Sequence, residues 1–338
     1  MKRIITATIA TLAFVFAVPA GLAFAQATSG QTGGQGLEIG PPLLNVVGDP
    51  GQVVRSRVSV RDVTKNPLVV TNQINDFVAN GEDGSPKILL DPGETSPYSI
   101  KNWITPLESV TLQPGKVKSF DIIVTIPKHA APGGYYGVIR FTGTPPSLKD
   151  TGVSLSASVG ALVLLKVNGD AKEQVSLTDF STANFDPNIG NLNNDLPNSL
   201  FESAPFMFVE KFKNSGNLHE QPFGKITITD MFGNTVTEIK VNDPPRNVLP
   251  GSTRRFNQIV QSKDLAGKFL FGLYHAKLET IYGSAVTPLV GSLTFWILPW
   301  KIMLAVIVGL IVLFFAVRFA IRSYIRRTVG RSRGGRRR

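Results

Sequence analysis

The chain has 338 residues and a formal net charge of +11, which would suit a nucleic-acid-binding protein if the charge covered one face. Instead, Lys2 and Arg3 precede an N-terminal apolar stretch, and nine arginines lie between Arg318 and Arg338. Removing these eleven from the 35 basic residues leaves 24, which equals the number of Asp and Glu residues. The composition therefore excludes a broad basic surface for nucleic acid and, because the chain has no cysteine, any disulfide or thiolate chemistry.

Residues 1–25 have the pattern of a secretory signal peptide. The apolar stretch runs from Ile4 to about Ala20, and Ala23 and Ala25 provide the small residues that a signal peptidase needs. We expect cleavage between Ala25 and Gln26. An uncleaved N-terminal anchor is the alternative, and either arrangement places the following region outside the cytoplasm. Residues 26–36 are mostly Gly, Ser, Thr and Gln and are predicted to be a flexible leader.

Residues 37–168 are predicted to form a first β-domain. Apolar residues alternate at Val54, Val58 and Val60, and again at positions 120, 122, 124 and 126. Residues 159–167 are apolar almost without interruption, which indicates a strand buried on both faces. Pro-Gly and Asn-Gly pairs mark the turns, and no segment shows a helical period.

Residues 173–294 are predicted to form a second domain of the same kind. The segment from Ser181 to Pro205 lacks periodicity and is predicted to be a long loop. A short internal repeat supports two copies of one fold. Pro114-Gly115 followed by Phe120 matches Pro250-Gly251 followed by Phe256, at an offset of 136 residues. Many short strands without intervening helices favour tandem immunoglobulin-like antiparallel β-sandwiches, and the fold class is therefore all-β.

Residues 295–317 are predicted to be a transmembrane α-helix that follows the two sandwiches. Their length is about 34 Å as a helix, enough to cross a hydrocarbon core of about 30 Å. Trp296, Trp300 and Lys301 suit the outer membrane interface, and Arg318 suits the inner one. The arginine-rich tail, residues 318–338, is expected to be cytoplasmic, because basic residues near a span favour that side. The predicted product is a single-pass cell-membrane protein with an extracytoplasmic ectodomain.

Two surface features are candidate ligand-binding sites. Tyr135 and Tyr136 are adjacent in a Gly-flanked strand, so one ring points inward and the other outward, where it can stack on a glycan. Arg55, Arg57 and Arg61 share one strand face and can contact an anionic wall polymer. Core packing of the tyrosines and a solvated sheet face for the arginines are the structural alternatives.

No catalytic residue, metal ligand or cofactor is predicted. The three histidines, His129, His219 and His275, are not flanked by further ligands or a nucleophile, so structural or exposed roles are expected. The acids and amides between Asp186 and Asp195 are candidate oxygen ligands for calcium, but they lack the spacing and central glycine of an EF-hand loop. Whether this loop binds an ion is left open.

Several motifs resemble those of bacterial WxL-interacting cell-surface proteins. The matching segments are residues 112–115, 126–130 and 132–137 in the first half, and residues 213–219, 222, 224–226 and 230–233 in the second. The resemblance implies two immunoglobulin-like domains and a C-terminal anchor. It also implies partners: peptidoglycan and WxL-type surface proteins for the first domain, host or matrix ligands for the second.

The predicted function is therefore a membrane-anchored scaffold that holds surface proteins or cell-wall polymer, without enzymatic turnover. An envelope-acting hydrolase or transferase is one alternative. A subunit of a surface-assembly machine is the other, and it would need a partner in the membrane, for which only Gly309 and a few alanines in the span are suited.

Overall fold

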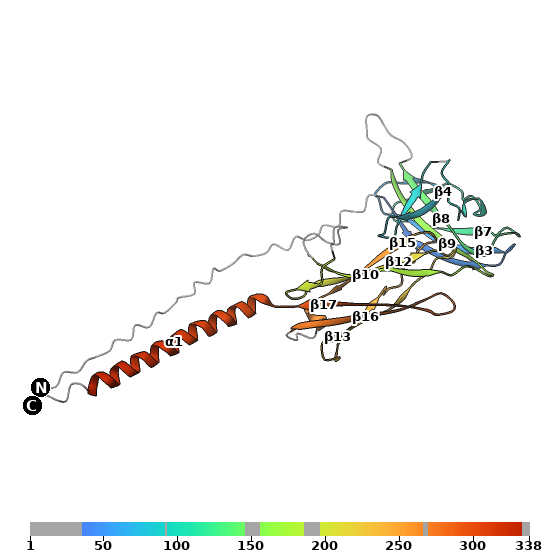
Figure 1. Ribbon diagram of the computed structural model, residues 1–338. Helices are drawn as coiled ribbons and strands as arrows, with labels where there is room; N and C mark the ends of the chain where they lie inside the picture. Colours follow the sequence, from blue (N-terminus) through green and yellow to red (C-terminus); the bar gives the residue numbers. More distant parts are fainter. Residues whose placement is uncertain (1–35, 92, 146–155, 186–196, 266–269, 333–338) are drawn as a thin grey trace, which may run out of the picture.

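Two β-sandwiches and one long helix make up the part of the chain that the computed structural model describes, residues 36–91, 93–145, 156–185, 197–265 and 270–332 (Figure 1). The proposed signal cleavage site, the predicted calcium loop and the end of the tail lie outside these residues. The prediction of two tandem immunoglobulin-like antiparallel sandwiches followed by one apolar helix is confirmed.

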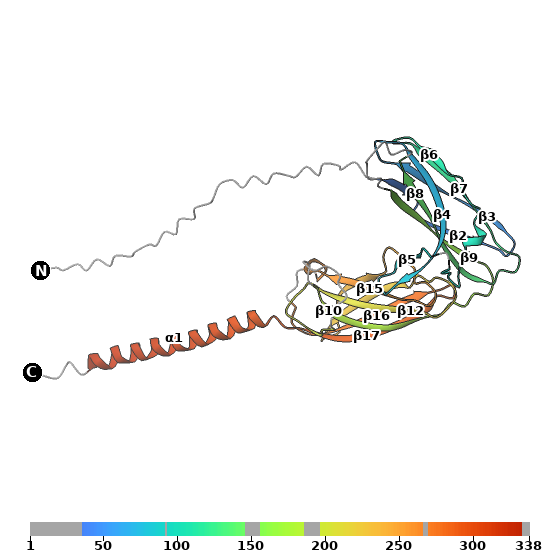
Figure 2. The ribbon, with the colours of Figure 1, turned by 90° about the horizontal axis from the view of Figure 1, so that it is seen from above.

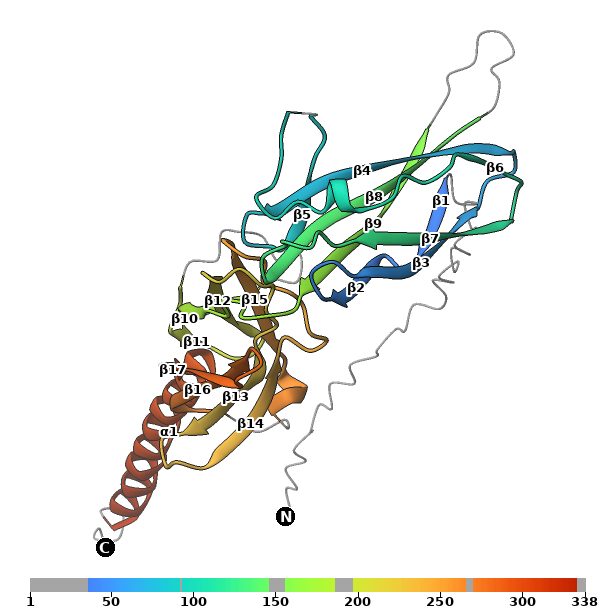
Figure 3. The ribbon, with the colours of Figure 1, turned by 90° about the vertical axis from the view of Figure 1, so that its right-hand side faces the viewer.

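The first sandwich pairs a three-stranded sheet with a larger one. The small sheet has the order β1-β3-β7, with β1 at Leu37–Gly40, β3 at Val53–Asp62 and β7 at Val117–Thr125. The large sheet has the order β2-β9-β8-β4-β5, and β6 also pairs with β4 (Figure 3). Its strands are β2 (Leu43–Gly48), β4 (Leu68–Asn80), β5 (Ser85–Leu89), β6 (Val110–Leu112), β8 (Gly133–Thr144) and β9 (Ala157–Val167). A short 3-10 helix, η1, covers Lys101–Trp103.

Apart from β6, each described strand of the first sandwich has a counterpart in the same place in the second. One sheet has the order β10-β12-β15 and the other β11-β17-β16-β13-β14. As β2 runs parallel to β9 in the first domain, β11 runs parallel to β17 in the second. The strands are β10 (Val175–Asn184), β11 (Leu200–Phe201), β12 (Phe206–Asn214), β13 (Phe223–Asp230), β14 (Thr235–Val241), β15 (Thr253–Val260), β16 (Gly272–Tyr282) and β17 (Thr287–Ile297), with the 3-10 helix η2 at Ser262–Leu265.

The repeated Pro-Gly turns occupy equivalent places in the two domains. Gly115 and Gly251 both have φ near +73°, a left-handed conformation that glycine adopts without strain. The N–H of Gly115 donates to the carbonyl of Asp62 at 2.8 Å, and that of Gly251 donates to the carbonyl of Asn214 at 2.9 Å. Since Asp62 ends β3 and Asn214 ends β12, each turn is fastened to the same strand of its own sandwich.

The alternating pattern correctly identified the core of the first domain. Val58 and Val60 are buried, as are all four apolar residues of the 120–126 pattern, whereas Arg55, Arg57 and Arg61 are exposed. Strand β9 is buried on both faces, as its continuous apolar sequence predicted: residues 161, 163, 165 and 167 pack in the sandwich core, while Leu164 packs on the opposite side. That opposite side faces the second domain.

The predicted start of the membrane helix at residue 295 is wrong. Phe295 and Ile297 are 1% exposed and end strand β17, where the Phe295 ring packs 5.3 Å from that of Phe206. The helix α1 begins at Trp300 and extends to Ser332. Its segment Trp300–Arg322 is long and apolar enough to cross a membrane and is not buried by the described part of the protein. Hydropathy alone does not separate the end of β17 from the helix that follows, because both segments are apolar.

The loop predicted from Ser181 to Pro205 is also shorter than expected. Residues 181–184 complete β10, because the backbone of Ser181 to Asn184 pairs with β12. Residues 200 and 201 form β11, and Phe201 is buried against Phe206 at 4.7 Å between ring centroids. Backbone pairing and one buried ring therefore order parts of a segment whose sequence has no strand period.

Candidate functional site

Two of the motif segments, residues 132–137 and 213–219, meet where the two domains join. The side-chain amide of Asn217 donates to the carbonyl of Pro132 at 2.9 Å, and the N–H of Gly134 donates to the carbonyl of Asn217 at 2.7 Å. Asn217 also holds the interdomain linker, since its Oδ1 accepts the N–H of Lys172 at 2.8 Å and its N–H donates to the carbonyl of Lys172 at 2.9 Å. One asparagine thus fastens together both domains and the linker.

The glycines of the first motif allow this close approach. A Cβ on Gly133 would lie 2.9 Å from the Asn217 side-chain nitrogen, and the φ of Gly133 is +141°. A Cβ on Gly134 would collide with the hydroxyl of Tyr136. Only glycine leaves room for the Asn217 backbone beside the start of β8.

Tyr136 is a junction residue and not a surface ring. It is 2% exposed, packs edge-to-face with Phe77 and Tyr98, and its hydroxyl lies 3.2 Å from Nδ1 of His219 in the second domain. Burial raises the pKa of Tyr136 and lowers that of His219 to about 4, with the nearby Lys166 ammonium adding to the fall. Both groups are therefore neutral at neutral pH, and the tyrosine O–H can donate to the imidazole.

The β4–β5 hairpin contacts the second domain at another place along the junction. Glu82 forms a 2.7 Å ion pair with Lys211, and its carbonyl accepts the N–H of Arg255 at 2.7 Å. The guanidinium of Arg254 packs directly on the backbone of Gly84. Figure 2 shows β5 above β15, at the inner side of the bend between the two domains. The relative placement of the domains is thus held at two separate contacts.

A cleft of about 300 Å³ lies at this junction. The first domain contributes mainly apolar side chains, and the second contributes polar and basic ones. The lining residues are Leu43, Asn45, Phe77, Gly84, Pro86, Leu162 and Leu164 from the first, and Gln221, Pro245, Arg246, Asn247, Leu249 and Arg254 from the second. An apolar wall facing two arginines is suited to a ligand that has both an apolar part and an acidic group.

Arg254 has unused hydrogen-bonding capacity in this cleft. Its Nη1 donates to the carbonyl of Asn247 at 2.7 Å, but its buried Nε has no hydrogen-bond partner among the described residues. Burial lowers the pKa of Arg254, the neighbouring charge of Arg246 lowers it further, and Asp83 opposes both. A guanidinium stays protonated despite such shifts, so the site keeps a partly desolvated positive charge that an anion would stabilise.

A second group of charges surrounds the linker. Glu173 accepts hydrogen bonds from the N–H and hydroxyl of Ser284 at 2.6 and 2.8 Å, and lies 3.9 Å from the Lys166 ammonium. Burial and the negative charge of Glu173 raise the pKa of nearby Glu220 to about 7. These carboxylates do not line the cleft. Their bonds serve to fix the linker against the β16–β17 hairpin.

The residues proposed from sequence as ligand contacts lie apart from this cleft. Tyr135 is half-buried, its ring 4.3 Å from that of Trp103 and its hydroxyl 3.0 Å from the carbonyl of Ala131. Tyr135 and Tyr136 do point to opposite sides of β8, since they belong to different apolar clusters. The ring that points out of the first sandwich is that of Tyr136, and the second domain covers it.

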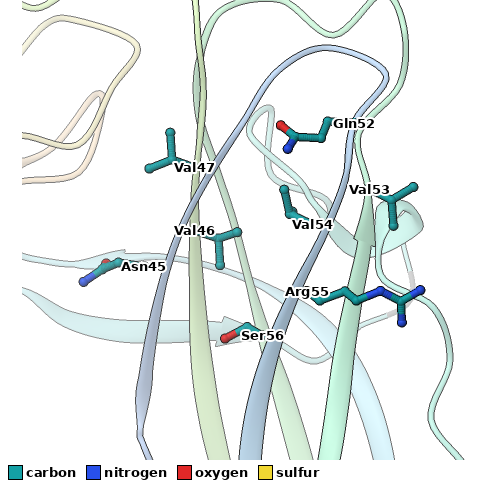
Figure 4. A pocket seen from close by; sticks show the side chains of 8 residues that line it. All are labelled: Asn45, Val46, Val47, Gln52, Val53, Val54, Arg55 and Ser56. Atoms are coloured by element: carbon teal, nitrogen blue, oxygen red, sulfur yellow. The ribbon is translucent and has the colours of Figure 1, made fainter.

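The arginine face is solvated and partly paired. Arg57 binds Asp121 at 2.8 Å and Arg61 binds Glu38 at 2.5 Å, in ion pairs that are open to water. Arg55 borders an opening of about 450 Å³ between β2 and β3, two strands that do not pair with each other. Figure 4 shows Arg55 directed away from β2 at this opening. The three arginines therefore remain accessible, but the structure does not bring them to the tyrosines.

Sequence reasoning missed the residues of the cleft. The continuous apolar run of β9 was the available signal for Leu162 and Leu164, because a strand buried on both faces must pack against something outside its own sandwich. Nothing in the sequence distinguished Arg246 and Arg254 from other basic residues. Among the described residues no three His, Asp or Glu side chains gather in a way that could hold a metal ion. His129 and His275 are exposed.

Comparison with known proteins gives distant structural likenesses only. No protein-family model and no curated protein matches the chain. The class 5 fimbriae chaperone CfaA is 15% identical, with 76% of this chain and 98% of that chain covered and a TM-score of 0.37. A chain of the chaperone–tip adhesin complex of CFA/I fimbriae is 14% identical over 76% and 98%, with a TM-score of 0.38. A chain of the Salmonella enterica SafA pilin–SafB chaperone complex is 10% identical over 76% and 96%, with a TM-score of 0.35. Likenesses this distant say nothing about the activity or partners of this chain.

Proposed function

We propose that this protein is a membrane-anchored binding protein that holds a partner at the outer side of the cytoplasmic membrane, with the cleft between its two sandwiches as the main binding site. The proposed topology has both sandwiches outside and the arginine-rich tail inside. It follows from the apolar helix Trp300–Arg322 and the nine arginines of the chain's final segment.

The observation that carries the proposal is the partly desolvated guanidinium of Arg254, which lines a largely apolar cleft together with Arg246. A ligand carboxylate in the cleft would stabilise these two positive charges. Leu43 and Leu162, which line the cleft and keep exposed surface, would add apolar burial for the same ligand. We therefore expect a protein segment with an acidic group next to apolar side chains.

The resemblance to WxL-interacting proteins makes a WxL-type surface protein the first partner to test, and peptidoglycan the second. Binding without turnover is part of the proposal. The alternative of an envelope hydrolase is less favoured because the raised-pKa carboxyl of Glu220 lies beside the linker and does not line the cleft.

The test compares two double variants of the full chain in detergent that remove the same charge. Arg246→Gln with Arg254→Gln changes the cleft, whereas Arg57→Gln with Arg61→Gln changes the exposed strand face. Retention of WxL-type surface proteins and wall fragments on a column should fall at least tenfold for the cleft variant and stay unchanged for the strand-face variant. The opposite pattern would move the site to the arginine face predicted from sequence.

A second measurement separates binding from catalysis. Incubation of the unmodified chain with peptidoglycan should release no soluble sugar or peptide. Release that is lost in a Glu220→Gln variant would favour the hydrolase and overturn the proposed role.

A further inference from the structure

The end of the second sandwich next to α1 carries a set of exposed apolar side chains. They come from five separate places in the chain: the β13–β14 turn, the residue before β16, strand β11, strand β17 and the first residue of α1. These residues, here called the apolar rim, are Met231 (43% exposed), Phe232 (80%), Phe271 (47%), Leu200 (54%), Trp296 (46%) and Trp300 (55%).

Strand register places all of the rim at one end of the five-stranded sheet. Asp230, just before the turn, pairs with Tyr274 near the start of β16, and Gly272 pairs with Ile297 at the end of β17. Leu200 pairs with Trp296. The Met231 side chain lies directly over Gly272, so the turn packs on the neighbouring strand. Figure 1 shows α1 leaving the sandwich at this end.

The connection between the sandwich and α1 is short and fastened. Only Leu298 and Pro299 separate β17 from the helix, and two residues span at most about 7 Å. The N–H of Leu298 donates to the carbonyl of Phe201 at 2.7 Å, and Lys301 in the first helical turn forms a 2.9 Å ion pair with Glu202. The rim therefore stays close to the point where the apolar helix begins.

The turn itself presents Phe232 outward. The Asp230 carboxylate accepts the N–H of Phe232 at 2.9 Å and that of Asn234 at 2.8 Å, which fixes the turn with the phenyl ring away from the protein. An aromatic ring that is 80% exposed is unfavourable in water, whereas the bilayer interface is where aromatic side chains gather. The headgroup layer of about 5 to 8 Å is within reach of a rim tethered this closely.

We propose that the apolar rim inserts into the outer headgroup region of the bilayer, so that the second sandwich stands on the membrane in a fixed orientation. The proposal rests on the proposed membrane anchorage and adds the lipid surface as a partner of the second domain. The bilayer is favoured over a second copy of the chain because the rim is continuous with the first turn of the spanning helix.

The experiment uses the full chain in phosphatidylcholine vesicles. Because the chain has no cysteine, a single Phe232→Cys variant can carry one environment-sensitive NBD label. The matched control is Ala285→Cys, which is exposed in the β16–β17 hairpin at the opposite end of the same sheet. A third variant, Phe271→Cys, reports on the rim from a different segment.

At positions 232 and 271 we expect a blue-shifted NBD emission, which doxyl groups attached to the lipids should quench by at least half. At position 285 we expect the emission of a label in water, without quenching. Water-like emission at 232 and 271 in vesicles that carry the chain on flotation would overturn the docking while leaving the anchorage intact. Failure of the chain to float would overturn the anchorage itself. Blue-shifted emission without lipid quenching would identify a protein contact and refute the lipid assignment.

Discussion

Glu210 is a carboxyl group buried among the aromatic side chains of the second sandwich, and its replacement by glutamine should change how stability depends on pH. Glu210 shares its face of β12 with Phe208 and Phe212 and is 0% exposed. Among the described residues, no hydrogen bond of normal geometry reaches either carboxylate oxygen, although the Gln258 amide lies close enough to moderate the effect of burial. Burial raises the pKa of Glu210 from 4.5 to about 8.

The sign of the effect follows from proton linkage. Below pH 4.5 the carboxyl is protonated in both the folded and the unfolded chain and adds no pH dependence. Between pH 4.5 and 8 the unfolded chain releases its proton while the folded chain keeps it, so the free energy of unfolding falls as pH rises. The full loss is about 5 kcal/mol, since each pKa unit corresponds to about 1.4 kcal/mol.

The Glu210→Gln variant lacks this loss, because an amide of nearly the same shape does not ionise. Urea unfolding of the full chain in detergent, followed by circular dichroism from pH 4 to pH 9, should show the variant gaining about 5 kcal/mol relative to the unmodified chain across that range. Glu238→Gln, which removes an exposed carboxylate from β14 of the same domain, should show no such gain. Parallel stability curves for Glu210→Gln and the unmodified chain would refute the assignment of a buried, protonated carboxyl.

Three further predictions address the first domain, the junction and the topology. Phe120→Ala should destabilise the first sandwich by about 3 to 5 kcal/mol in the same unfolding assay, because it empties a packed site beside Phe141; an unchanged first transition would show that the core is misplaced. Asn217→Ala should widen the distribution of interdomain distances in small-angle scattering, since it removes the side-chain bonds to Pro132 and Lys172, and an unchanged distribution would contradict the role of Asn217. Protease added to intact cells should leave only the helix and the tail from Arg318 protected, and a protected ectodomain would contradict the topology.

The sequence alone was sufficient for the architecture. Alternation at residues 120–126 identified a strand with one buried face, because successive side chains of a strand point to opposite sides. The two Pro-Gly pairs marked equivalent turns, because their glycines need a positive φ that few other residues adopt. These properties are local, so neighbouring residues carry them.

The boundaries and the site required the tertiary structure. Phe295 is as apolar as the helix that follows, and only its packing against Phe206 shows that it belongs to the sandwich. The sequence left open which of Tyr135 and Tyr136 points outward, and Tyr136 is buried because residues distant in the chain, among them His219, 83 residues away, pack against it. Burial lowers the pKa of Arg254, and the apolar wall that it faces belongs to the other domain. Burial, desolvation and lost hydrogen-bond partners depend on which distant segments meet, and no local pattern of residues specifies that.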